Sequence, residues 1–122
     1  ITRLRMAKRQ VESALQKNCI VWLRVQHSYL AKMIFAIPNG GFRNAREAAI
    51  MKAEGVTAGV SDVILLVPRK GYGGVCIEFK TLKGKQTKHQ EEWQEASERH
   101  GNKYVICRTF DDFRKEIKDY LS

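Results

Sequence analysis

Two carboxylates lie inside apolar stretches of the sequence that otherwise have the composition of buried strands. Asp62 begins the run DVILLVP, and Glu78 lies within GVCIEFK, with Lys80 two residues further on. Removing an ionised carboxylate from water is costly unless a cation or hydrogen bonds compensate the charge. Three interpretations follow: these faces are exposed to solvent, Lys80 neutralises one acid, or the two acids together hold a cation.

A bound divalent cation would give the two acids a chemical function. Mg²⁺ sites commonly combine one or two carboxylates with waters and a substrate phosphate, so Asp62 and Glu78 are candidate metal ligands. The carbonyl of Phe79, between Glu78 and Lys80, is a further candidate. Residues two apart in a strand share one face, so Lys80 could orient an attacking water or offset charge that develops on a phosphate. The pattern predicts a site of phosphodiester hydrolysis.

A β-hairpin is expected to bring the two acids together. The glycine-rich loop RKGYGG separates the two apolar runs and suits a hairpin connection. With a turn near Lys70 or Gly71, antiparallel pairing places Asp62 opposite a residue between 78 and 80. Side chains alternate along a strand, so Phe79 should point to the opposite face from the acids.

The remaining elements follow from hydrophobic periodicity and end signals. A strand, a crossover helix and a second strand imply a parallel pair with a right-handed connection. We therefore expect an α/β fold with a mixed sheet of about four strands, in which an antiparallel hairpin is extended by a parallel strand and helices flank the sheet. The length of 122 residues suits one domain, 1–122. The expected helices are 5–26, 43–55, 87–101 and 109–121, and the expected strands are 32–39, 62–68, 74–80 and 103–108.

The formal net charge of +9 indicates a polyanionic partner, most often nucleic acid, although a basic surface can also serve solubility alone. Lys83, Lys85 and Lys88 follow Glu78 before the next acid and are candidate DNA contacts. Asn39 belongs to an Asn-Gly-Gly stretch that is either a simple turn or a further DNA contact. Three widely spaced cysteines among aliphatic residues indicate reduced core thiols, and zinc-ligand spacings are missing. Without a membrane-length apolar run or a signal-peptide pattern, we expect a cytoplasmic location.

The order of these motifs resembles the PD-(D/E)XK nuclease superfamily. An acid on the first helix (Glu12) precedes the turn Gly59-Val-Ser-Asp62, the Glu78-x-Lys80 pair and a helix that bears Gln90. Within that superfamily, the segments GVTAGVSDVILLV, CIEFKTLKGKQTKHQEEW and IPNGG resemble the VRR-NUC family, the virus-type replication-repair nuclease domain. The similarity covers nearly the whole chain, like the stand-alone form found in phages. One departure is Ser61, which stands where the family usually has Pro.

The resemblance implies a restriction-endonuclease-like fold and a DNA endonuclease that needs Mg²⁺ or Mn²⁺. It implies Asp62 and Glu78 as metal ligands, Lys80 as the catalytic lysine, Glu12 as an accessory acid acting on the metal or its waters, and Gln90 as a residue that positions water or phosphate. Stand-alone members are similar to dimeric Holliday-junction resolvases, which implies a homodimer that cuts branched DNA, in the host cytoplasm if a phage encodes it. One alternative is a non-catalytic basic DNA-binding module. A second is a sequence-specific nuclease, which is disfavoured because 122 residues leave little room for a recognition domain.

Overall fold

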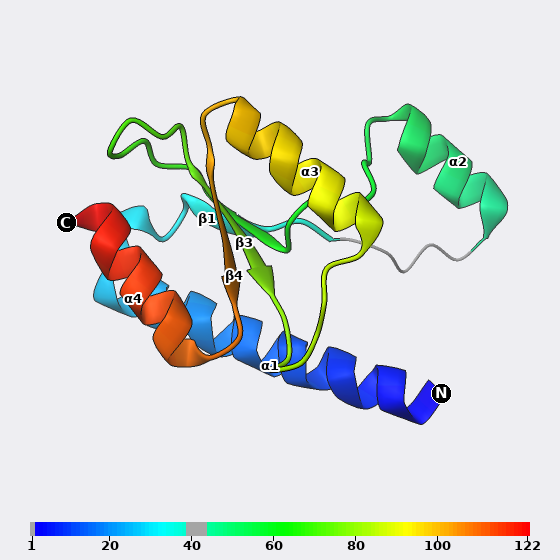
Figure 1. The fold of residues 1–122 in the computed structure, drawn as a ribbon, viewed down its shortest axis with the longest axis horizontal. Coiled ribbons are helices and arrows are strands. Elements are labelled where there is room, and N and C mark those ends of the chain that lie inside the picture. Colours follow the sequence, from blue (N-terminus) through cyan, green and yellow to red (C-terminus); the bar gives the residue numbers. More distant parts are fainter. Residues whose placement is uncertain (1, 39–43) are drawn as a thin grey trace.

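The computed structural model describes residues 2–38 and 44–122, with side chains from residue 7 onward. The elements follow the expected order (Figure 1). They are α1 (Thr2–Gln26), the short 3-10 helix η1 (Ser28–Leu30), β1 (Ile34–Ala36), α2 (Ala45–Ala53), β2 (Val63–Leu65), β3 (Val75–Phe79), α3 (Lys88–Arg99), β4 (Lys103–Cys107) and α4 (Phe110–Leu121).

The four strands form one mixed sheet in the order β1-β2-β3-β4. β1 pairs with β2 and β2 with β3 in antiparallel fashion, whereas β3 and β4 are parallel. The hairpin between β2 and β3 pairs Val63 with Ile77. The two central residues of its turn, Lys70 and Gly71, have left-handed backbone, with φ of 53° and 84°. Positive φ at both positions is what a two-residue type I′ hairpin turn requires. The predicted fold class is confirmed, and so is the turn position.

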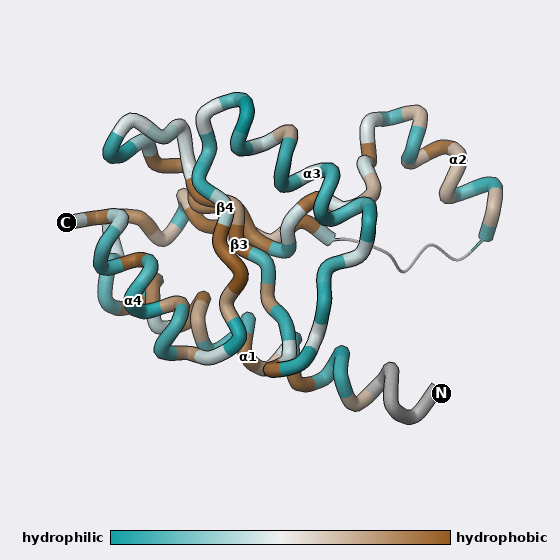
Figure 2. Tube along the Cα trace, viewed as in Figure 1, coloured by the Kyte–Doolittle hydropathy of each residue, from teal (hydrophilic) through white to brown (hydrophobic). Residues whose placement is uncertain are grey.

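The apolar core lies between the sheet and the helices α1 and α4, which cover one of its faces (Figure 1). Leu23 of α1 and Phe113 of α4 are fully buried there against the strands. Phe79 of β3 points into this core, and its ring centroid lies 6.0 Å from that of Phe113. Figure 2 shows the hydrophobic segments concentrated in the strands, with hydrophilic residues on the outer helix faces. Phe79 therefore points away from the acids, as strand alternation predicts.

Helix α3 covers the opposite face of the sheet. Its first turn is fixed by a capping box, in which the Thr87 side chain accepts from the Gln90 N–H and the Gln90 side chain accepts from the Thr87 N–H. Farther along, the ring of Trp93 lies beside that of Tyr104 in β4, with centroids 6.1 Å apart. The face that carries Glu78 is thus covered by a helix whose start is held in one position.

Helix α2 extends away from the sheet (Figure 1) and contains no buried residue. Asn44 is its N-cap and accepts a hydrogen bond from the Glu47 N–H at 2.8 Å. Over the residues that the structure describes, no helix has the length and apolar character needed to span a membrane.

Candidate active site

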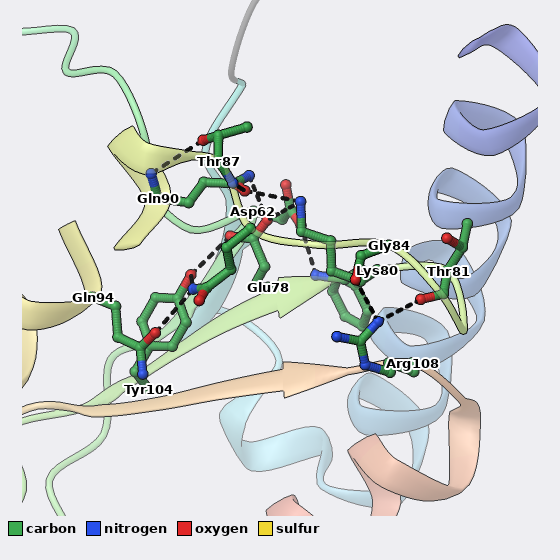
Figure 3. Close-up of polar contacts among 12 residues, drawn as sticks. Asp62, Glu78, Lys80, Thr81, Gly84, Thr87, Gln90, Gln94, Tyr104 and Arg108 are labelled. Carbon is green, nitrogen blue, oxygen red and sulfur yellow. Dashed lines mark hydrogen bonds and ion pairs between the residues drawn. The ribbon is translucent and has the colours of Figure 1, made fainter. Parts of the chain in front are cut away.

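The hairpin brings Asp62 and Glu78 together at the end of β3. Continuing the pairing of Val63 with Ile77 by one residue places Asp62 opposite Glu78. Asp62 Oδ2 accepts a hydrogen bond of 2.7 Å from the Phe79 N–H (Figure 3). Asp62 is half-buried, whereas Glu78 is only 1% exposed. The two acids predicted from the sequence therefore meet, and one of them lies deep in the structure.

Lys80 and Gln90 complete a network around Glu78 (Figure 3). The Lys80 ammonium lies 3.4 Å from Glu78 Oε2 and donates to Gln90 Oε1 at 2.8 Å. Gln90 Nε2 in turn donates to Glu78 Oε2 at 2.6 Å. Since Gln90 Oε1 also accepts from the Thr87 N–H, this one amide links the start of α3 to both the acid and the lysine.

The tight turn before Asp62 depends on Gly59. Its φ of +85° is left-handed, and a Cβ added there would lie 2.2 Å from the carbonyl oxygen of His89. Only glycine allows this approach without moving backbone atoms. The close packing of Gly59 against the first turn of α3 keeps Asp62 beside Gln90 and its partners.

Tyr104 is a contact to Glu78 that sequence reasoning missed. Its hydroxyl is buried and donates to Glu78 Oε1 at 2.9 Å (Figure 3). The parallel register pairs Tyr104 with Cys76, so the two residues share a sheet face with Glu78. A signal was present in the sequence, because aligning the last strand parallel to β3 places a tyrosine on the acid-bearing face.

Burial and nearby negative charge raise the pKa of both acids. The pKa of Glu78 is raised to about 7, first by burial and then by the charge of Asp62, while Tyr104 and Lys80 oppose the rise. Burial also raises the pKa of Asp62, opposed by the Phe79 N–H; the negative charge of Glu12 adds to the rise and Lys80 again opposes it. Glu12, half-buried on α1, is therefore electrostatically coupled to the site.

The donor set consists of oxygen atoms and fits a hard divalent cation better than a metal that requires Cys or His ligands. One lysine lies near the two carboxylates of Asp62 and Glu78, and the negative charge of Glu12 also acts on Asp62. A further cation would therefore reduce the repulsion among these acids. Among the described residues, no group of three or more His, Cys, Asp or Glu side chains is placed to hold a metal ion. Because the N–H and C=O of a strand residue face the same neighbour, the Phe79 carbonyl lies on the Asp62 side of β3. Two carboxylates, a carbonyl and waters suit Mg²⁺ or Mn²⁺.

The candidate DNA contacts lie in the segment between β3 and α3, the two elements that carry Glu78 and Gln90. Lys83 and Lys85 are exposed in the loop after β3, and Lys88 is exposed at the first position of α3. The same loop reaches α1, where a Cβ added to Gly84 would lie 3.4 Å from Lys8 Cε. Asn39 lies outside the described residues.

The fold and the site indicate a nuclease built on a mixed sheet. Known proteins with a similar sequence or structure belong to the same class. A solved structure named "VRR_NUC domain protein" superposes with a TM-score of 0.79 at 28% sequence identity, covering 91% of this chain and 88% of that chain. The VRR-NUC domain family matches residues 4–111. No curated protein matches the sequence.

The chain belongs to the VRR-NUC domain family. Members of this family are nucleases, so the protein is a nuclease-type domain with DNA as its substrate. The resemblance found in the sequence is thereby confirmed at the level of the family.

Proposed function

We propose that the protein is a divalent-metal-dependent DNA endonuclease that hydrolyses phosphodiester bonds, prefers branched DNA such as four-way junctions, and acts as a homodimer. The observation that carries the proposal is the meeting of Asp62, Glu78 and Lys80 at the end of β3, with Gln90 joining the last two. A lysine held within 3.4 Å of a buried acid that adjoins a second acid is a costly arrangement for structure alone.

Each residue has a role in this chemistry. Asp62, Glu78 and the Phe79 carbonyl would hold Mg²⁺ or Mn²⁺, with Glu12 acting through waters. The ion, when bound, would activate a water and withdraw charge from the phosphate. Lys80 carries a positive charge to the place where the phosphorus–oxygen bond breaks and negative charge develops. Gln90 fixes the Lys80 ammonium and can position water or phosphate with its amide.

Charge and family support the preference for branched DNA and the dimer. The net charge of +9 supplies attraction to phosphates that does not depend on base sequence. Lys83, Lys85 and Lys88 would contact the DNA backbone beside the site. A two-fold dimer, which the resemblance to junction resolvases suggests, would place two sites for paired cuts across a junction.

One cleavage assay tests the activity. Purified protein is incubated with supercoiled plasmid, linear duplex and a synthetic four-way junction in Mg²⁺, Mn²⁺ or EDTA. We expect cutting in either metal and none in EDTA, with the junction cut fastest. Lys80→Ala should slow cutting by about 100-fold or more through the lost positive charge. Lys115→Ala, an exposed lysine on α4, is the matched control and should cut normally.

The alternative outcomes are distinct. DNA binding without cutting in every metal would identify a non-catalytic binding module instead. Equal cutting of duplex and junction would remove the preference for branched DNA. Sedimentation that shows only a monomer, with and without junction DNA, would refute the homodimer.

A further inference from the structure

A rigid turn lies immediately after Lys80. The Gly84 N–H donates to the Thr81 carbonyl at 3.1 Å and closes a four-residue turn with Leu82 and Lys83 at its corners. The guanidinium of Arg108, at the end of β4, donates to the carbonyls of Thr81 and Gly84 at 2.7 Å each and lies 3.4 Å from that of Leu82 (Figure 3). Arg108 is itself half-buried. These charge-assisted contacts tie the turn to the end of β4.

Leu82, at a corner of this turn, has an apolar side chain that is exposed to solvent. It is 73% exposed, and Lys83 and Lys85 beside it are exposed as well. A single exposed leucine is ordinary on a protein surface. This one differs because a charged side chain fixes its backbone, and because its Cα lies within about 7 Å of that of Lys80. A substrate phosphate at Lys80 would bring DNA against it.

We propose that Leu82 is a specificity-determining wedge that packs against exposed base faces of the DNA, while the lysines around it bind the backbone phosphates. This inference rests on the proposed function, whose preference for branched DNA it explains. Apolar side chains insert at DNA steps where bases unstack, and the cost of unstacking is least where bases are already unpaired or strained. A branch point offers such bases, whereas an intact duplex does not.

Two neighbours give the wedge its place. Arg108 acts as a positioning residue, because its guanidinium contacts the backbone carbonyls of the turn that carries Leu82. Lys8 of α1 lies beside Gly84, at the end of the turn, so Lys8, Lys83 and Lys85 are all exposed cations close to the turn that carries Leu82. An apolar side chain with cations nearby suits a base whose neighbouring phosphates are negatively charged.

The test is DNA binding in EDTA, where metal-dependent cutting does not interfere. Fluorescence anisotropy gives the affinities of wild type, Leu82→Ala and Leu82→Met for a four-way junction and for a duplex with the same arm sequences. Leu82→Ala should weaken junction binding about tenfold by removing buried apolar surface, and leave duplex binding within about twofold. Leu82→Met, which keeps an apolar side chain of similar length, should bind as wild type does.

A matched control and a second readout separate the wedge from general effects. Val25→Ala shortens an aliphatic side chain of similar exposure, 75%, on α1, and should change neither affinity. With 2-aminopurine at the branch point, wild type should raise the fluorescence by unstacking the base, and Leu82→Ala should not.

Each result decides the question. An unchanged ratio of junction to duplex affinity in Leu82→Ala, or no fluorescence change with wild type, overturns the wedge. Because these are binding measurements, they stand apart from the cleavage assay: a protein that binds as expected but never cuts contradicts the proposed nuclease and keeps the wedge.

Discussion

Replacing Glu78 by glutamine should remove much of the pH dependence of the protein's stability. Glu78 has its pKa raised from an ordinary value of 4.5 to about 7 in the folded protein. The folded state therefore binds more protons than the unfolded state between these two values, and stability falls as pH rises through that window. Above about 7 both states are ionised, and the loss reaches its full size.

The magnitude follows from the pKa difference. A shift from 4.5 to about 7 corresponds to about 3 kcal/mol in the free energy of unfolding. Between pH of about 5.5 and about 8, the part of this loss that falls in the interval is about 2 kcal/mol. For a domain of this size, that change lowers Tm by roughly 8 °C. Glu78→Gln has no proton to release and should not show this component.

The assay is urea unfolding of wild type and Glu78→Gln at several pH values in EDTA. Subtracting the variant from the wild type cancels the titrating groups that do not interact with Glu78, so the difference reports on Glu78 together with its charged neighbours Asp62 and Lys80. Adding Mg²⁺ at the highest pH should raise the stability of wild type, because a ligand of the folded state stabilises it by mass action, and should raise that of Glu78→Gln less. Parallel pH profiles for the two proteins would refute the reasoning, since burial would then not disfavour the charged acid.

Two further variants test the supports of the site. Gly59→Ala should lower the free energy of unfolding, measured in urea, by about 3 kcal/mol or more, because its Cβ would clash with the His89 backbone. The control Gly71→Ala, at a similar positive φ but with open space around it, should lower this free energy by about 1 kcal/mol. Equal decreases in the two variants would contradict the clash. Tyr104→Phe should weaken Mn²⁺ binding about tenfold by calorimetry, because the lost hydroxyl orients Glu78. The exposed Tyr29→Phe serves as its control, and unchanged affinity in both would exclude an orienting role for Tyr104.

Much of the fold and the placement of the acids could be predicted because the signals are local. Alternation along a strand decides which residues share a face, and a glycine-rich turn fixes the register of the two strands that it joins. Those two rules placed Asp62 against Glu78 and turned Phe79 toward the core. The expected helix 87–101 likewise matches α3, whose N-cap is Thr87, because helix end signals are local as well.

The contacts that hold the site together could not be predicted in the same way, because they join elements distant in the chain. Arg108 donates to the carbonyls of a turn 24 to 27 residues earlier. Every residue has a backbone carbonyl, so the sequence does not indicate which carbonyls a side chain will contact. Gly59 is read as a turn residue, whereas its approach to His89 depends on how α3 lies over the sheet. The depth of Glu78 has the same origin: alternation gives its face, but only the packing of α3 decides that the face is closed to water.

The hydrogen bonds around Glu78 explain how the fold can bury this acid. An ionised carboxylate has about four lone-pair positions. Within the described chain, Tyr104 occupies one on Oε1, while Gln90 and Lys80 approach Oε2. These three contacts compensate the burial of the charge and leave about one lone-pair position for a cation. In the proposed metal-dependent reaction, the same three partners would hold the carboxylate in one orientation, so that the reorganisation that a flexible acid requires would be avoided.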